Sequence, residues 1–257
     1  MLDRFYDTDL SLLYPATIIL IVAAAGFGAW IGRRSRVDVS GAPDTATLTG
    51  AALGLLALLL AFSFSLALSR YDTRRSMVLE EANAIGSTAN FALMLPEPAQ
   101  RQILDLLRQY AAVRTGLGVP YDLAKLGRDT ERSLDLQNRL WQQATQATEA
   151  APQSLPVYRF VASLNEMNNI HERRLTALRY HVPGPVMLVL IGLAIFAMGF
   201  TGFHAALTGA GRSIPVLIMS VVIAVVMMLV VDLDRPARGL IQVPIQPLVD
   251  AAQSIPR

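Results

Sequence analysis

The stretch "GAALGLLALLLAFSFSLALSRYDTRRSMVLEEANAIGS", residues 50–87, joins a long apolar run to a dense cluster of charges. No proline and no loop-like cluster separates the two halves, so both are compatible with one helix. We therefore predict a continuous helix from Thr47 to about Leu95 that crosses a bilayer and continues into water. At 1.5 Å per residue this helix is roughly 70 Å long, more than twice the thickness of the hydrocarbon layer.

The whole chain is more apolar than an ordinary soluble domain of its length. It has 257 residues, of which 53% are hydrophobic, and its mean hydropathy is +0.41. The apolar residues are concentrated in four blocks that contain no charged residue and no histidine, at about 12–31, 47–68, 185–203 and 214–231. Blocks of this length are typical of transmembrane segments, and the hydrocarbon layer requires their backbone groups to be satisfied within helices.

The order of these blocks predicts an all-α membrane protein with four transmembrane helices in two pairs. The first pair lies within residues 1–68, and the second pair lies within 182–257 together with a short C-terminal tail. Residues 69–181 form a helical extramembrane domain, with further helices after "LPEP" and at about 129–150 and 155–181. Apolar residues at helical spacing mark two faces that we expect to be buried: Ile103, Leu106, Leu107, Tyr110 and Val113 on one helix, and Val157, Phe160, Leu164, Met167, His171, Leu175 and Leu178 on another.

Composition argues against several classes of protein. The net charge is only +2, which gives no reason to expect a nucleic-acid partner, and there is no cysteine for a disulfide or a thiolate metal site. The chain has three histidines, and His171 stands directly beside Glu172, so the two point to different faces of a helix. We interpret His171 as a packed residue, and we predict no enzyme activity, no cofactor and no metal site.

The distribution of arginine around the spans favours an orientation with the N-terminus, residues 69–181 and the C-terminus in the cytoplasm. This assignment conflicts with "GRRSR", which directly follows the first span and favours the opposite orientation. The acidic leader of the first block also differs from a signal peptide, so we expect that block to be retained in a bacterial inner membrane. The arginines compared are Arg4, Arg70, Arg74, Arg75, Arg173, Arg174, Arg179, Arg235 and Arg238 on the first side, and Arg33, Arg34, Arg36 and Arg212 on the other.

Two pairs of glycines have the four-residue spacing that lets membrane helices approach closely. Gly28 and Gly32 lie in "GAWIG", and Gly50 and Gly54 lie in "GAALG". The pattern is compatible with packing inside one chain and equally with contacts between subunits.

A polar stripe follows one face of the long helix. The face is apolar in the membrane, carries hydroxyls near the membrane edge and is acidic beyond it. If several copies surround an axis, the stripe lines a pore with an apolar constriction and a ring of carboxylates, which attract cations. Alternatively, the serines only hydrogen-bond within or between spans, and the charges only face water. The stripe consists of Leu58, Phe62, Ser65, Ser69, Asp72, Ser76, Glu80 and Asn83, at helical spacing.

Charged residues also gather where the second and fourth spans end. We predict a membrane-edge clamp in which the carboxylates of the fourth span pair with arginines that follow the second span. The alternative is an ordinary helix end with interfacial charges. The clamp would contain Arg70, Arg74, Arg75, Asp232, Asp234 and Arg235.

Three stretches resemble a known family: "LLLAFSFSLALSRYDTRRSMVLEEANAIGS" (58–87), "NEMNNIHERRLTALR" (165–179) and "DLDRPARGLIQVPIQPLVDA" (232–251). They are similar to signatures of bacterial four-span proteins described as bestrophin-like, and more distantly to bestrophins. Bestrophins are ring-shaped ion channels whose second span lines the pore, so the resemblance implies that Phe62 and its stripe neighbours correspond to an apolar neck. Arg74, Arg75 and Ser76 replace the usual tryptophans, and no acidic run resembles a calcium clasp.

These observations lead to two hypotheses about function. The first is an oligomeric ion channel with the second span at its axis, whose partners are the lipid bilayer, further copies of the chain and inorganic ions. The second is a non-conducting membrane scaffold or sensor whose helical domain mediates oligomerisation or partner binding.

Overall fold

The computed structural model describes residues 10–35, 42–116, 123–209, 213–235 and 239–256. Arg4, Arg36, Arg212 and Arg238 of the charge comparison lie outside these residues. The described parts of the chain contain helices and no strand, which confirms the predicted all-α class. The helices are α2 (Leu10–Arg34), α3 (Ala42–Ala92), α4 (Ala99–Gly116), α5 (Leu123–Ala150), α6 (Leu155–Arg179), α7 (Gly184–Leu207), α8 (Ser213–Asp234) and α9 (Gln246–Ser254).

The helix predicted across the membrane edge is present as one element. α3 has 51 residues and no break between the apolar run and the charge cluster. At 1.5 Å per residue it is about 76 Å long. No proline occurs between residues 44 and 95, so nothing in this stretch removes a backbone donor from the helix.

Four helical stretches are long and apolar enough to cross a membrane, and each contains one of the four predicted blocks. These are Leu12–Arg34, Thr45–Ala92, Leu155–Leu207 and Ile214–Asp234. The third stretch includes α7, whose residues hold the block predicted at 185–203. The chain is therefore a membrane protein with four candidate spans.

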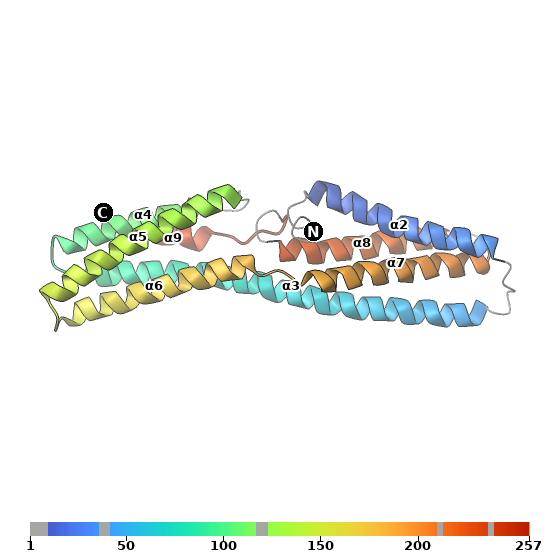
Figure 1. Ribbon diagram of the computed structural model, residues 1–257, viewed down its shortest axis with the longest axis horizontal. Coiled ribbons are helices and arrows are strands. Elements are labelled where there is room, and N and C mark those ends of the chain that lie inside the picture. The colour runs from blue at the N-terminus through green and yellow to red at the C-terminus, as the bar shows by residue number, and fades with distance from the viewer. Residues whose placement is uncertain (1–9, 36–41, 117–122, 210–212, 236–238, 257) are drawn as a thin grey trace. The chain divides into compact units, whose positions relative to one another are not determined.

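The first compact unit comprises Met1–Ser69 and His181–Arg235, so it holds α2, α7, α8 and the first part of α3 (Figure 1). α2 and α7 approach closely because glycines face each other. A Cβ atom on Gly28 would fall on the carbonyl oxygen of Gly199, and one on Gly202 would fall on that of Ala25. Gly32 similarly faces Phe203, whereas Gly50 and Gly54 of α3 have nothing within 4 Å. The first glycine pair therefore serves packing inside the chain.

The second compact unit comprises Arg70–Tyr180 and Pro236–Arg257. Here the later part of α3 contacts α4 and α6 through Glu81, α4 packs on α5 and α9, and α5 packs on α6 (Figure 1). The predicted faces of α4 and α6 form much of the core: all five named residues of α4 are buried, and so are those of α6 except Leu178, which is half-buried. That this unit lies outside the membrane stays a prediction.

The C-terminal residues belong to this second unit. Leu248 of α9 is 0% exposed, and Ile255, just beyond α9, is 5% exposed. The Tyr71 hydroxyl of α3 is 3.4 Å from the carbonyl oxygen of Gln242 in the preceding extended stretch. The sequence predicts only a short tail here, and α9 was not expected.

Candidate functional site

The polar stripe predicted on the long helix is a face of α3 that its own chain leaves open. Leu58 is 52% exposed and Phe62 is 65% exposed, although both lie in the apolar part of the helix. Ser65, Ser69, Asp72 and Ser76 are also exposed, and Glu80 is half-buried. Another molecule, lipid or a second copy of the chain, must therefore cover the apolar part of this face.

The opposite face of α3 is buried along almost its whole length. Steps of three, four or seven residues connect its buried members, as expected for one side of a helix. The chain thereby sets the rotation of α3 and decides which residues remain accessible. The buried members include Thr49, Ala52, Leu56, Leu60, Ser63 and Ala67 in the first unit and Arg74, Val78, Glu81, Ile85, Thr88 and Ala92 in the second.

The carboxylates of the stripe are not neutralised by arginine within the described residues. The Ser76 hydroxyl donates a hydrogen bond to Oε1 of Glu80 at 2.8 Å. Asp72 forms no ion pair with the parts of the chain that the structure describes. The negative charge of these two side chains is therefore directed to the surroundings of α3.

The acidic residues of the predicted clamp are buried at the end of α8. Asp232 and Asp234 are 0% exposed and Arg235 is 3% exposed. Oδ2 of Asp234 accepts a hydrogen bond from the backbone N–H of Val182 at 2.7 Å and lies 3.9 Å from Nδ1 of His181. Asp234 thus joins the end of α8 to the segment before α7, a contact that the sequence analysis missed.

The arginines of the clamp differ in exposure. Arg74 is 3% exposed, Arg70 is half-buried and Arg75 is exposed. Their pairing with Asp232 or Asp234 stays a prediction.

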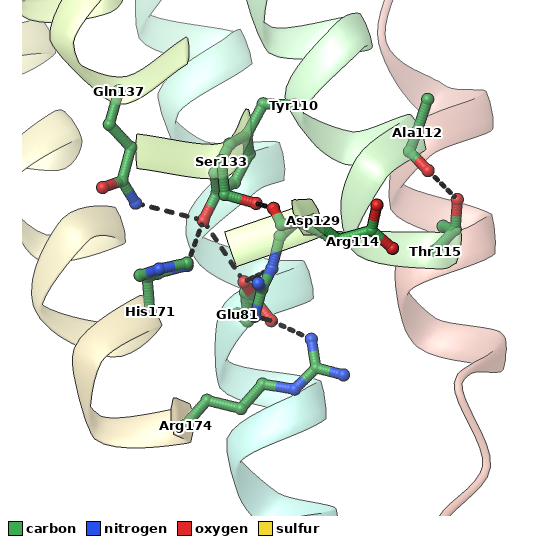
Figure 2. A network of polar contacts seen from close by, with 10 residues as sticks. All are labelled: Glu81, Tyr110, Ala112, Arg114, Thr115, Asp129, Ser133, Gln137, His171 and Arg174. Atoms are coloured by element: carbon green, nitrogen blue, oxygen red, sulfur yellow. Dashed lines mark hydrogen bonds and ion pairs between the residues drawn. The ribbon is translucent and has the colours of Figure 1, made fainter. Parts of the chain in front are cut away.

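A second polar site lies in the core of the second unit, where Glu81 of α3 faces two arginines. Nε of Arg114 donates to Oε1 of Glu81 at 2.6 Å, and Arg174 of α6 donates to the other carboxylate oxygen. The side chains of Glu81 and Arg114 are 0% exposed, and that of Arg174 is 6% exposed. Figure 2 shows the two guanidinium groups on either side of the carboxylate. One carboxylate therefore joins three helices.

Tyr110 of α4 extends this network toward α5 and α6. Its hydroxyl donates to Oε1 of Glu81 at 3.3 Å, accepts from the Gln137 amide at 3.4 Å and lies 3.2 Å from Nδ1 of His171 (Figure 2). Because the hydroxyl proton is directed to Glu81, Nδ1 of His171 is assigned as the donor to the Tyr110 oxygen. His171 is fully buried, as its interpretation as a packed residue requires.

The environment decides the charge of each group in this network. Burial alone would raise the pKa of Glu81, but Arg114 and Arg174 outweigh burial and lower this pKa to about 2. Burial lowers the pKa of His171 to about 4, and Arg114 acts in the same direction. Burial and the Glu81 charge raise the pKa of Tyr110. At neutral pH, Glu81 is therefore ionised, while His171 and Tyr110 are neutral.

This network was not predicted from the sequence. A local signal was present. Glu81 follows Val78 by three residues and precedes Ile85 by four, so it lies on the apolar face of its helix. Arg114 follows Tyr110 by four residues and Arg174 follows His171 by three. Charges on otherwise apolar faces predict buried ion pairs.

The described residues contain no group of three histidine or acidic side chains that could hold a metal ion. The network itself offers one carboxylate, which two arginines already occupy. Its geometry is that of a structural joint between helices.

Comparison with known proteins adds a family and a fold. The model of the bestrophin-like domain matches residues 19–248. A bacterial bestrophin homologue from Klebsiella pneumoniae has a TM-score of 0.66 and 18% sequence identity, and the alignment covers 96% of this chain and all 100% of that one. A point variant of the Klebsiella pneumoniae homologue gives 0.63 and 18%, with 92% and 99% covered. No curated protein matches the chain. At this level of identity the structures establish the shared fold.

Proposed function

Because the chain belongs to the bestrophin-like family, we propose that it is an oligomeric ion channel in which α3 of each copy faces a common axis. The single observation that carries this proposal is the open face of α3. Phe62 and Leu58 are more than half exposed within an apolar segment, and the exposed side chains beyond them are polar or acidic. A lipid-facing surface has no need for the two serines that follow.

The chemistry of the stripe favours a pore over a dry contact between helices. Along the same face, large apolar groups give way to Ser65 and Ser69 and then to Asp72 and Glu80. Apolar rings can close a pore by excluding water, and rings of carboxylates attract cations. We propose that Phe62 forms the constriction and that the acidic residues select inorganic cations.

The proposal includes a location. The channel lies in a bacterial inner membrane, with the second compact unit, the N-terminus and the C-terminus in the cytoplasm. The excess of arginine near the corresponding span ends supports this orientation. We also propose a clamp at the membrane edge, in which carboxylates at the end of the fourth span pair with arginines that follow the second span. Its members are Arg70, Arg74, Arg75, Asp232, Asp234 and Arg235.

The decisive experiment measures ion flux into proteoliposomes together with the mass of the detergent-free particle. We expect the particle to be a closed ring of several copies. We also expect the cation flux to be higher in Phe62→Ala than in the parent chain, because the smaller alanine side chain weakens the apolar barrier. Phe196→Ala on α7 is the matched control, because Phe196 is 55% exposed and lies on a different helix. We expect this variant to conduct like the parent chain.

Two results would contradict the proposal. A monomer or dimer in lipid nanodiscs excludes a central pore formed by α3. A larger particle that conducts no ions, with or without Phe62→Ala, supports the scaffold or sensor hypothesis instead.

A further inference from the structure

The last turns of α2 carry aromatic and basic side chains that the chain itself does not cover. Phe27 is 62% exposed and Trp30 is 53% exposed. Their rings stack, with centroids 5.8 Å apart and planes inclined by 20°. Arg33 and Arg34 follow at the end of the helix, and both are exposed. This surface is independent of the stripe on α3 and of the buried network.

The guanidinium of Arg34 lies over the indole ring of Trp30, with its Cζ atom 5.2 Å from the ring centroid. A cation in this position is attracted by the face of the ring. Because the guanidinium is planar, stacking uses its face and leaves the N–H groups at its edge available. Neither Arg33 nor Arg34 forms an ion pair within the part of the chain that the structure describes. Their donors are therefore free to bind an anion.

The position of these residues at the end of a membrane span indicates which anion they can bind. α2 is long and apolar enough to cross the bilayer, so its exposed aromatic rings lie against lipid. Tryptophan prefers the depth of the headgroups, and an arginine at the end of a span extends toward the same layer. The phosphate group of a phospholipid lies at this depth, and a guanidinium binds phosphate with two parallel hydrogen bonds. Net negative charge on the lipid further increases the attraction.

We infer that Trp30, Arg33 and Arg34 form a binding site for the phosphate headgroup of an anionic phospholipid. Trp30 holds the guanidinium of Arg34 in place, and Arg33 supplies a second positive charge. A simpler role is also available, because basic residues in the last turn of a helix stabilise its free carbonyl groups. That role requires positive charge but no enrichment of any lipid, so the distribution of lipids around Trp30 distinguishes the two.

The chain is suited to this measurement because it has two tryptophans, Trp30 and Trp141. Trp141→Phe leaves Trp30 as the only indole. The full-length variant is reconstituted in vesicles of equal parts phosphatidylglycerol and phosphatidylcholine, with bromine on the tails of one lipid or of the other. Bromine quenches tryptophan fluorescence at contact, so the two quenching values report which lipid surrounds Trp30. We expect stronger quenching by brominated phosphatidylglycerol, with a local excess of roughly fivefold for each arginine involved.

The arginines are tested in the same background with Arg33→Gln and Arg34→Gln together. This pair is expected to make quenching by the two lipids equal. Arg128→Gln with Arg132→Gln on α5 is the matched control, because both arginines are exposed and belong to the other compact unit. The control is expected to retain the excess. Equal quenching by the two lipids in the parent background, or an excess that survives removal of Arg33 and Arg34, would overturn the inference.

Discussion

Nε of Arg114 and Oε1 of Glu81 lie 2.6 Å apart in a place where neither side chain has any exposed surface. The two residues belong to different helices and are separated by 33 positions in sequence. A buried ion pair contributes little net stability relative to apolar residues, because both charges lose their hydration. Its geometry nevertheless restricts how α3 and α4 can be rotated. Glu81 thus lies on the buried face of α3, whereas the polar stripe lies on the face of α3 that remains exposed.

We predict that Arg114→Met destabilises the second compact unit by about 3–5 kcal/mol, because one partner of a buried pair is removed. The measurement is unfolding of the full-length chain in detergent in a Trp30→Phe background, followed by the fluorescence of Trp141. Arg101→Met on the same helix is the control. The Arg101 side chain is 80% exposed and pairs with Glu97 at the surface. Loss of this exposed pair should change the free energy of unfolding by less than about 1 kcal/mol. Equal effects of the two substitutions would show that burial of the Glu81 pair has no energetic role.

His171 predicts how stability changes with pH. Burial lowers its pKa from the ordinary 6.5 to about 4 in the folded chain, so between these values the unfolded chain binds more protons. Stability is therefore lost as pH falls from about 6.5 to about 4. His171→Gln should remove this dependence, whatever its effect at neutral pH. Unfolding measured across this window checks the slope, and an unchanged slope in His171→Gln would contradict the assignment.

Glu81 predicts a separate loss at lower pH. Its pKa is lowered from 4.5 to about 2, so its contribution to stability is present above 4.5 and is lost as pH falls toward 2. Because Glu81→Gln cannot ionise, this variant should be less stable than the parent at neutral pH and should approach it near pH 2. Unfolding curves at several pH values measure this convergence. A constant difference between the two chains would show that Glu81 is not ionised in the fold.

We predict that alanine substitutions at two glycines of α2 have different effects on stability. Gly28→Ala places a methyl group on the backbone of α7 and should destabilise the first unit by about 1–3 kcal/mol. Gly26→Ala has nothing within 4 Å and should be neutral or slightly stabilising, because alanine favours a helix. Thermal stability in detergent compares the two. Similar stability of both variants would mean that α2 and α7 do not approach closely.

Asp72 tests the sign of the ions that the proposed pore conducts. Asp72→Lys should lower the permeability of cations relative to anions, because it replaces a negative ring with a positive one. The measurement is the reversal potential in planar bilayers with a salt gradient. Asp135→Lys on α5 is the control, because Asp135 is also exposed and belongs to a different helix from the stripe. A reversal potential that Asp72→Lys leaves unchanged would place the ion path elsewhere.

Much of this architecture can be read from the sequence because its causes are local. Absence of charge over about 20 residues specifies a span, and absence of proline permits α3 to continue across the membrane edge. Apolar residues at spacings of three and four identify the buried faces of α4 and α6. The position of Phe62, Ser65 and Asp72 on one face follows from helical geometry alone.

Other features depend on which helical faces meet, and the linear pattern does not contain that information. Glu81 meets Arg114 and Arg174, which are 33 and 93 positions away, so no local window includes the network. Two glycine pairs have the same spacing, but only the pair facing α7 is used within the chain. The docking of α9 on α4 likewise depends on a surface built by distant residues. The periodicity of apolar residues determines which face of each helix can be buried. Only tertiary packing determines which of these faces contact each other.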